Sequence, residues 1–502
     1  MVSPARVFGS PTLPTVQDLT IVAKHTIYSA IVGSRAYGLA GPASDTDRRG
    51  VYQAPTDAFW TLGKPPTHVE GPRPEEFSWE VERACTLALQ ANPTVWECLS
   101  SPLVEHVTDA GRALLDLRPA FLSIRAARTY GDYAKDQLNK LTSVRQRTGE
   151  VRWKQAMHMV RLLRAGAHVL RTGDVLVDVS HLRDELLAVR RGEVSWEDFQ
   201  ALAAALDADL AAAERESKLP EEPDRAAVDA FLVSLRGGAP AARSAPARVT
   251  EHPPIPAGIP AWAGDVADEH PYPLAFATVS GAHLYGFASV DSDLDLRGSH
   301  LLPLDQVVGL ETGPDTVESG GVREGMELDV VSQELAKFIR LLLRPNGYVL
   351  EQLLSPLVVR TSALHEELKA LAPHCLTAEH ARHYLGFASG QWLLYAKTGE
   401  LKPALYTLRV LHTGIHLLRT GEVEADLRVL NTLAYVPELI EAKKAGEHRA
   451  LPPGLVAAER LAADVARLTA ELEAARDESK LPPTPSAGAA LNDLLIRTRL
   501  AR

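Results

Sequence analysis

The amino-acid sequence predicts an α+β protein made of two copies of one unit, each a small α+β head followed by a helical bundle. The main observation is an internal repeat, because residues 33–50 read GSRAYGLAGPASDTDRRG and residues 281–298 read GAHLYGFASVDSDLDLRG. Half of these positions match without a gap. In both copies, segments rich in β-forming residues come first, and segments rich in Ala, Leu, Glu and Arg follow. This order predicts a sheet and then helices.

The repeat continues downstream in the same order. HVLRTGDV from His168 matches HLLRTGEV from His416, and ESKLP occurs at Glu216 and again at Glu478. Ordered matches over about half of the chain each indicate a duplication. The stretch from Gly237 to the second copy is rich in Pro, Ala and Gly, which is typical of a linker.

The bulk composition bounds the classes of protein. A chain of 502 residues is too long for one ordinary core. A net charge of −11 argues against nucleic-acid binding by the overall charge of the protein, but it is compatible with a local basic groove. The three cysteines, Cys85, Cys98 and Cys375, form no CxxC pair, which favours a reducing cytoplasm. No run of 18 apolar residues and no secretion signal is present, so we expect no membrane span.

Two short segments of the first head and three of the second are predicted to be strands. TIYSAIVGS from Thr26 and PLAFATVSG from Pro273 are rich in β-formers and end at a glycine, so each predicts a strand entering a tight turn. DRRGVY and DLRGSHLLP predict the second strand, with acids at its start, and MELDVV from Met326 predicts a third in the second copy. In the helical part, residues 153–173 have apolar side chains at helical spacing and a stop signal at Gly173.

The acidic signature Ser-Asp-x-Asp is the centre of the functional argument. It places Asp45 and Asp47 in the first copy and Asp293 and Asp295 in the second. Alternate residues on a strand point to one face, so each pair aims two carboxylates at one point. Two like charges together are costly unless a cation neutralises them, and Mg²⁺ or Mn²⁺ takes such oxygen ligands together with substrate phosphates. The motif follows a strand-ending glycine by twelve residues in both copies, which predicts two phosphoryl-transfer sites.

A third carboxylate is expected from a neighbouring strand. In the second copy the choice is Asp329, and counting back from the matched Glu351 and Glu97 places Glu75 opposite it. Glu76 is one step away and stays an alternative. The competing interpretation for each is a solvated surface acid.

The glycine turn is predicted to bind nucleotide phosphates. Backbone can approach a phosphate closely only where no Cβ intervenes, so Gly33 and Gly281 are candidates, with Ser34 and Arg35 beside the first. The second copy has Ala282 at the serine position and therefore lacks that hydroxyl. An ordinary tight turn is the competing interpretation.

The helical parts add a second group of candidate phosphate ligands. These lie at i, i+4 and i+7 on one helix face, as Lys154, His158 and Arg161 in the first copy and Lys402, Tyr406 and Arg409 in the second. A solvated basic stripe explains them equally well. Arg49 and Arg297 follow the second acid by two residues and could pair with the acids or with substrate.

At these residues the sequence resembles the DNA polymerase beta-type nucleotidyltransferase superfamily, which combines Gly-Ser, a spacer, Asp-x-Asp and a third acid. The wording GSRAYGLAGPASDTDRRGVY, with ALQANPTVWECLSSP and WKQAMHMVRLLRAG downstream, is similar to its RNA-ligase-associated branch, RlaP. The resemblance implies a mixed-sheet head, two Mg²⁺ ions and transfer of a nucleoside monophosphate from a nucleoside triphosphate with release of pyrophosphate. It further implies an RNA end as acceptor, in repair or before ligation, with an RNA ligase as a partner.

This reading divides the chain into five segments. They are a nucleotidyltransferase head over 1–115, a helical domain over 116–236, a linker over 237–264, a second head over 265–370 and a second helical domain over 371–502. Departures from the family pattern leave two alternatives open: heads that bind nucleotide or RNA without turnover, and a transferase acting on protein or small-molecule hydroxyls. The sequence makes no prediction of the oligomeric state.

Overall fold

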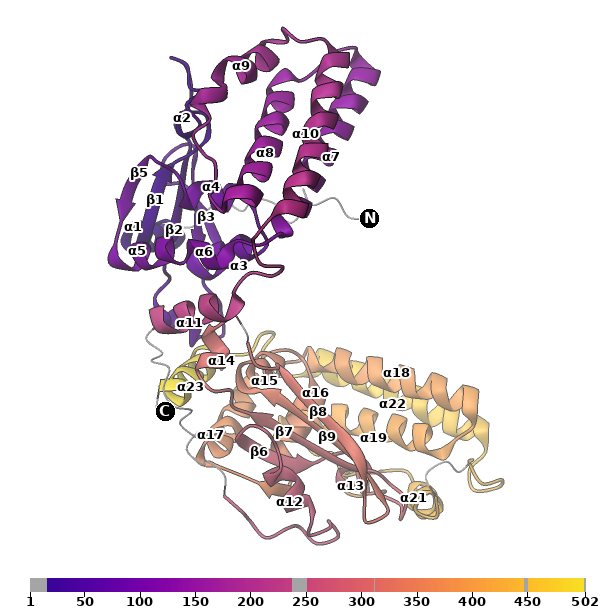
Figure 1. Ribbon diagram of the computed structural model, residues 1–502. Helices are drawn as coiled ribbons and strands as arrows, with labels where there is room; N and C mark the ends of the chain where they lie inside the picture. Colours follow the sequence, from indigo (N-terminus) through magenta and orange to yellow (C-terminus); the bar gives the residue numbers. More distant parts are fainter. Residues whose placement is uncertain (1–15, 237–250, 311, 447–449, 501–502) are drawn as a thin grey trace. The chain divides into compact units, whose positions relative to one another are not determined.

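The computed structural model describes residues 16–236, 251–310, 312–446 and 450–500. The chain forms two compact units. Unit 1 comprises residues 1–59, 64–243 and 308–312, and unit 2 comprises residues 60–63, 244–307 and 313–502. Each unit contains one copy of the repeat, with a five-stranded sheet and a set of helices (Figure 1), so the predicted duplicated α+β architecture is confirmed.

The head of unit 1 is a mixed sheet with the strand order β3-β4-β2-β1-β5. Strands β2 and β4 are parallel, and the other neighbours are antiparallel. The strands are β1 (Thr26–Ile31), β2 (Arg48–Tyr52), β3 (His68–Glu70), β4 (Glu76–Glu80) and β5 (Val104–Val107). The short helices of this head are α1 (Val16–His25), α2 (Gly33–Ala36), η1 (Thr56–Phe59), α3 (Val81–Leu89), α4 (Pro93–Leu99), α5 (Asp109–Asp116) and α6 (Arg118–Phe121).

The helical part of unit 1 is built on three long helices that lie alongside one another in Figure 1. Its elements are α7 (Arg125–Thr148), α8 (Trp153–Thr172), η2 (Ser180–Leu182), α9 (Arg183–Arg191), α10 (Trp196–Glu216) and α11 (Arg225–Leu235). Helix α8 ends where the sequence predicts, because Gly173 adopts the left-handed conformation with φ of 78° and its amide caps the carbonyl of Val169.

Unit 2 repeats this plan, with the strand order β10-β6-β7-β9-β8 and β7 parallel to β9. The strands are β6 (Leu274–Val279), β7 (Leu294–His300), β8 (Thr316–Arg323), β9 (Met326–Glu334) and β10 (Val358–Arg360). The helices of its head are α12 (Ala263–Asp268), α13 (Gly281–Leu284), α14 (Asp305–Val308), α15 (Leu335–Leu342), α16 (Gly347–Leu354), α17 (Ala363–Leu371) and η3 (Ala372–Cys375). Its helical part contains α18 (His380–Thr398), α19 (Leu401–Thr420), α20 (Leu427–Leu430), α21 (Val436–Lys444), α22 (Ala458–Glu478) and α23 (Gly488–Leu500).

Head and helical part share one apolar core within each unit. In unit 1, Ile27 and Val51 of the sheet belong to the same buried cluster as Met157 and Val160 of α8. Burial of these side chains against one another is the main force that holds the helices to the sheet. The predicted border between residues 115 and 116 therefore falls inside one compact unit.

The end of the predicted linker is folded. Residues 237–250 lie outside the described residues, but Ile259, Trp262 and Ala263 are buried in a core cluster with Val279 of β6. Proline and glycine in this stretch suggested a linker by composition, and burial of its few large apolar side chains overrides that signal. Residues 251–264 thus belong to unit 2.

Candidate active sites

A glycine turn follows the first strand of each head. Gly33 has φ of 68° and Gly281 has φ of 63°, in the left-handed region that favours glycine. A Cβ at Gly33 would lie closer than 3.0 Å to the carboxylate of Asp47, and one at Gly281 would lie closer than 3.0 Å to that of Asp295. The structure thus adds a reason for glycine beyond phosphate approach, since the second acid of the motif packs directly against the turn.

The register of two parallel strands places a further acid beside that one. In head 2, Asp295 of β7 pairs with Asp329 of β9. In head 1, Arg48 pairs with Glu76, and the Arg48 amide donates to the Glu75 carbonyl at 2.9 Å, which sets Asp47 beside Glu75. The Glu76 side chain is bonded to Arg73 at 2.8 Å, so we keep Glu75 as the candidate third acid.

The loop before the acids is held differently in the two heads. In head 1, the exposed Arg35 donates to the carbonyls of Ser44 at 2.9 Å and Asp45 at 3.2 Å. In head 2, the fully buried Lys443 of α21 donates to the hydroxyls of Ser289 at 3.0 Å and Ser292 at 2.8 Å. Arg35 therefore anchors the loop that carries Asp45, a contact the sequence did not indicate.

In head 2, an arginine lies between the second motif acid, Asp295, and the third acid, Asp329. Arg297 donates from Nη2 to Asp295 Oδ1 at 2.6 Å and to Asp329 Oδ2 at 2.7 Å. Burial raises the pKa of Asp295, and the nearby charge of Arg297 opposes that effect. The carboxylate of Asp293 lies near enough to raise this pKa further. The charges of Asp293 and Asp329 therefore both act on Asp295.

Arg161 and Arg409 do not join the predicted cationic stripe. Arg161 is 3 % exposed and donates to Glu97 at 2.6 Å, and Arg409 is 2 % exposed and donates to Glu351 at 2.6 Å. Arg161 lies about two turns after Lys154 on the same face of α8, at a level where Glu97 and Tyr37 cover that face, so Arg161 forms a buried ion pair. Arg409 forms the equivalent pair with Glu351. This placement corrects the expectation that these two arginines contact phosphate.

A buried tyrosine completes each ion pair. The Tyr37 hydroxyl donates to Glu97 at 2.6 Å and the Arg161 guanidinium lies 3.9 Å from its ring centroid. Tyr285 repeats the arrangement in the second copy, donating to Glu351 at 3.1 Å. Burial raises the pKa of Tyr37 well above its usual range. No role was predicted for these tyrosines from the sequence, although each follows the glycine of its turn by four residues.

This cluster ties the glycine turn to the helical part. Tyr37 follows α2 directly, Glu97 lies on α4 and Arg161 lies on α8. Rotation of the turn relative to α8 would break buried charged hydrogen bonds. The ion pair therefore sets where the first residues of α8 lie relative to the acids.

The remaining members of the predicted stripe lie nearer the surface. Lys154 is exposed, and His158 is half-buried. Burial lowers the pKa of His158 to about 4, with further lowering by Arg161, Lys154 and Arg190. In the second copy the charge of Lys402 acts on Asp295, so this lysine approaches the acids.

Tyr406 takes the place of His158 in the second copy and is packed on aromatic rings. Its ring lies edge-on to Tyr285 at 5.5 Å and to Phe287 at 5.4 Å. It therefore connects α19 to the turn of head 2.

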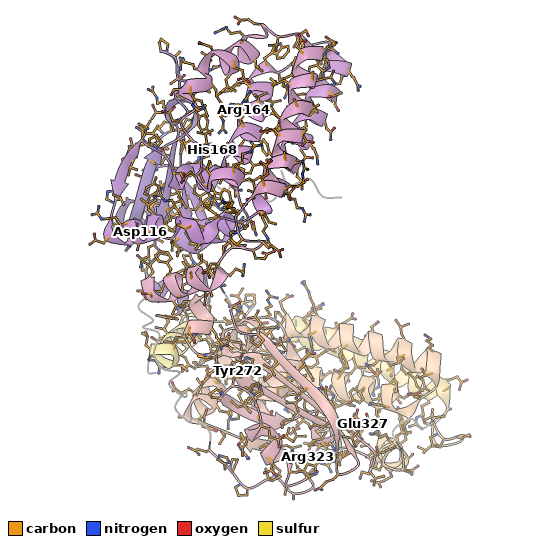
Figure 2. All side chains as sticks on the ribbon, in the orientation of Figure 1. Asp116, Arg164, His168, Tyr272, Arg323 and Glu327 are labelled. Carbon is orange, nitrogen blue, oxygen red and sulfur yellow. The ribbon has the colours of Figure 1, made fainter. Side chains whose placement is uncertain are left out.

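In unit 1, Arg164 of α8, marked in Figure 2, donates to Glu185 of α9 at 2.6 Å and holds that helix in place.

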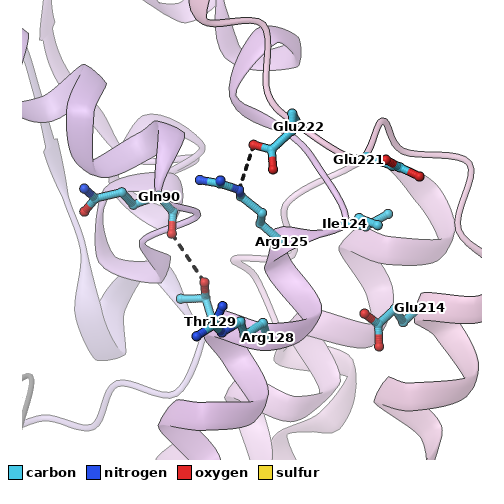
Figure 3. Close-up of a pocket in the computed structure, with 8 residues that line it drawn as sticks. All are labelled: Gln90, Ile124, Arg125, Arg128, Thr129, Glu214, Glu221 and Glu222. Atoms are coloured by element: carbon cyan, nitrogen blue, oxygen red, sulfur yellow. Dashed lines mark hydrogen bonds and ion pairs between the residues drawn. The ribbon is translucent and has the colours of Figure 1, made fainter. Parts of the chain in front are cut away.

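A cavity of about 580 Å³ in unit 1 lies away from the acids. Figure 3 shows Arg125 paired with Glu222 at 2.9 Å, and Thr129 donating to the carbonyl of Gln90 at 3.3 Å. Ion pairs and backbone bonds already occupy these side chains. None of the predicted site residues lines this cavity, so it does not bear on the predicted chemistry.

The acids fit a metal ion that takes most of its ligands from a substrate. Among the residues that the structure describes, no three His, Cys, Asp or Glu side chains form a metal-ligand cluster. Mg²⁺ commonly binds proteins through one or two carboxylates together with phosphate and water oxygens. The strand register sets Asp47 beside Glu75, so these two carboxylates are the candidates for such a site in head 1. Within the described ranges, no helix has the length and apolar character needed to cross a membrane.

Two known proteins are similar to parts of this chain. The chain is 35 % identical over 153 residues to uncharacterized protein MJ0002 of Methanocaldococcus jannaschii, covering 30 % of this chain and 63 % of that protein. It is 29 % identical over 189 residues to uncharacterized protein YcgL of Bacillus subtilis, covering 35 % of this chain and 71 % of that protein. The model of the RlaP family matches twice, over residues 15–234 and 264–497. The chain therefore belongs to RlaP, the RNA repair pathway DNA polymerase beta family, and carries the family's unit in tandem.

Proposed function

We propose that the chain transfers a nucleoside monophosphate from a nucleoside triphosphate to a hydroxyl, with an RNA end as the acceptor. The observation that carries this proposal is the register of the parallel strands β2 and β4 in head 1, which sets the backbone of Asp47, the second motif acid, beside that of Glu75. Asp295 and Asp329 are paired at the same place in head 2. Membership in a polymerase beta-type family supports nucleotidyl transfer, and the family's RNA repair pathway supports RNA.

Different residues of head 1 would bind the metal ion and the triphosphate. Asp47 and Glu75 would hold Mg²⁺ or Mn²⁺, with Asp45 at the adjoining loop. The ion, when bound, supplies positive charge that stabilises the developing charge on the phosphate oxygens. Lys154, exposed at the start of α8, would attract the triphosphate, and Ser34 in the glycine turn offers a hydroxyl to it.

The reaction is an in-line displacement at the α-phosphorus. A bond forms between the acceptor oxygen and the α-phosphorus, while the bond from that phosphorus to the oxygen bridging to the β-phosphate breaks. Pyrophosphate leaves with the electron pair, and the hydroxyl proton passes to a carboxylate of the acid site. Positioning by the buried Tyr37–Glu97–Arg161 cluster keeps α8 and the acid-bearing turn in one geometry.

The test is a labelling assay with the full chain, Mg²⁺ or Mn²⁺ and triphosphates labelled at the α-phosphate. Acceptors are short RNAs with free 3′ and 5′ hydroxyls, an unrelated protein and small diols. Label on an RNA end supports the proposal. Label on the protein or the diol alone would show that the acceptor is not RNA. Asp45→Ala combined with Asp293→Ala should abolish labelling, whereas the exposed control Asp132→Asn on α7 should not change it. Full labelling by the double variant would overturn the assignment of the acids.

A further inference from the structure

The duplication provides an internal comparison, because one matched pair of arginines behaves differently in the two heads. Arg49 and Arg297 each follow the second motif acid by two residues. They occupy equivalent places in β2 and β7. A difference between them therefore reflects the surrounding sequence.

In head 2, Arg297 is fixed by bonds on all three of its nitrogens. Nη2 bridges the carboxylates of Asp295 and Asp329, Nη1 donates to the Asp329 carbonyl at 2.8 Å, and Nε donates to the Tyr348 hydroxyl at 2.9 Å. The side chain is only 8 % exposed. A planar guanidinium thus already neutralises the two acids that the register brings together.

In head 1, Arg49 does not bridge the acids. Its Nη1 donates to the carbonyls of Arg48 at 2.8 Å and Glu75 at 3.3 Å, and its guanidinium lies 5.8 Å from the Phe77 ring centroid. In the part of the chain that the structure describes, Arg49 forms no ion pair with Asp47 or Glu75.

The sequence explains the difference through one position. Matching Glu97 with Glu351 sets Thr94 of head 1 opposite Tyr348 of head 2. Threonine is too short to offer the distant hydroxyl that Tyr348 presents to the guanidinium. Arg49 therefore lacks the contact that holds the Arg297 guanidinium over the acids.

A second, independent difference lies in the helix behind the motif loop. Helix α9 of unit 1 carries Arg190, and helix α21 of unit 2 carries Lys443. Lys443 is fully buried and bonded to both loop serines of head 2, whereas Arg190 is exposed beside His158. In head 1 the exposed Arg190 and Lys154 both act on His158, whereas head 2 uses Lys443 to hold its own loop.

We propose that Arg297 serves head 2 as a built-in cation, so that head 2 does not bind divalent metal and the metal-dependent transfer takes place in head 1 alone. This inference rests on the proposed function, because it assumes that the acids of head 1 bind metal. The physical reason is competition for the same oxygens. A divalent ion at Asp295 and Asp329 would have to displace a nearly buried guanidinium and leave it unpaired.

The experiment measures Mn²⁺ binding to the full-length chain by electron paramagnetic resonance, with a triphosphate analogue that cannot be cleaved between the α- and β-phosphates. Asp47→Asn should weaken the binding of Mn²⁺ at least tenfold, and Asp295→Asn should leave it unchanged. Tyr348→Thr, which copies the residue of head 1, should add Mn²⁺ binding that a further Asp295→Asn removes. Arg297→Gln should do the same if it folds, and Tyr348→Thr keeps the test valid if it does not.

The outcomes separate this inference from the proposed function. If Asp295→Asn weakens Mn²⁺ binding as strongly as Asp47→Asn, both heads bind metal and the inference is overturned while the proposed function stands. If neither variant changes Mn²⁺ binding, the acids bind no metal, and the proposed function fails together with the inference. The reciprocal substitution Thr94→Tyr is the matched variant in head 1 and should weaken Mn²⁺ binding there, and unchanged binding would count against the role given to Tyr348.

Discussion

Replacing Arg161 with methionine should destabilise unit 1 and leave unit 2 unchanged. The substitution keeps most of the side-chain length and removes the charge that neutralises Glu97. Both partners are almost fully buried, with 4 % of the Arg161 side chain and 6 % of the Glu97 side chain exposed. The remaining carboxylate would keep the Tyr37 hydroxyl as a donor but lose its counter-charge.

The size of the effect follows from this burial. Removing one partner of a buried pair typically costs about 3–5 kcal/mol, because an uncompensated charge stays in a medium that solvates it poorly. Since about 1.4 kcal/mol is a factor of ten, this corresponds to roughly a hundredfold or greater increase in the population of the opened state. Replacing Arg161 and Glu97 together by methionine should recover most of the loss, because no charge is then left buried.

Native-state hydrogen exchange of the full chain, resolved by peptide mass spectrometry, measures each unit separately. Peptides from α8 should exchange faster in Arg161→Met, while peptides from α19 should not. Arg409→Met is the matched control and should show the opposite pattern, because its partner is Glu351. If exchange in α8 is unchanged and the KM for the triphosphate is tenfold higher, the structural role of Arg161 is refuted and a contact between Arg161 and phosphate is supported.

Three further results are expected. Gly33→Ala should lower activity at least tenfold with the fold retained, because the new Cβ meets the Asp47 carboxylate and the left-handed backbone costs about 1–2 kcal/mol, whereas Gly41→Ala, with open space around it, should be neutral; equal activities in labelling assays would contradict this. The folded-state pKa of His158 is about 4 and its ordinary value is 6.5, so the unfolded chain binds the proton more readily and unit 1 should lose stability, by at most about 3 kcal/mol, as pH falls from 6.5 to 4. Denaturation of His158→Gln should lack that part of the pH dependence, and identical profiles would exclude the effect. Lys154→Met should raise the KM for the triphosphate several-fold with little change in stability, because this lysine is exposed, and a stability loss without a KM change would assign it to packing.

Much of the fold was predictable because its signals are local. The strand ending before Gly33, the helix ending at Gly173 and the repeat itself depend on short-range backbone preferences and on residue order. The pairing of Asp295 with Asp329 was also predictable, because a third acid in a β-rich segment was the natural neighbour. The linker over 237–264 was predicted from composition, which does not report that Ile259 and Trp262 pack into a core cluster.

The sequence by itself determined the duplication and the α+β class, and it predicted the acids, since all of these follow from patterns that repeat along the chain. Only the tertiary structure decided that Arg161 and Arg409 are buried, because helical spacing states which residues share a face and not which face meets the core. It also decided that Arg297 and Arg49 have different partners. Those partners come from other strands and helices, and side-chain contacts between distant segments depend on packing that no local pattern encodes.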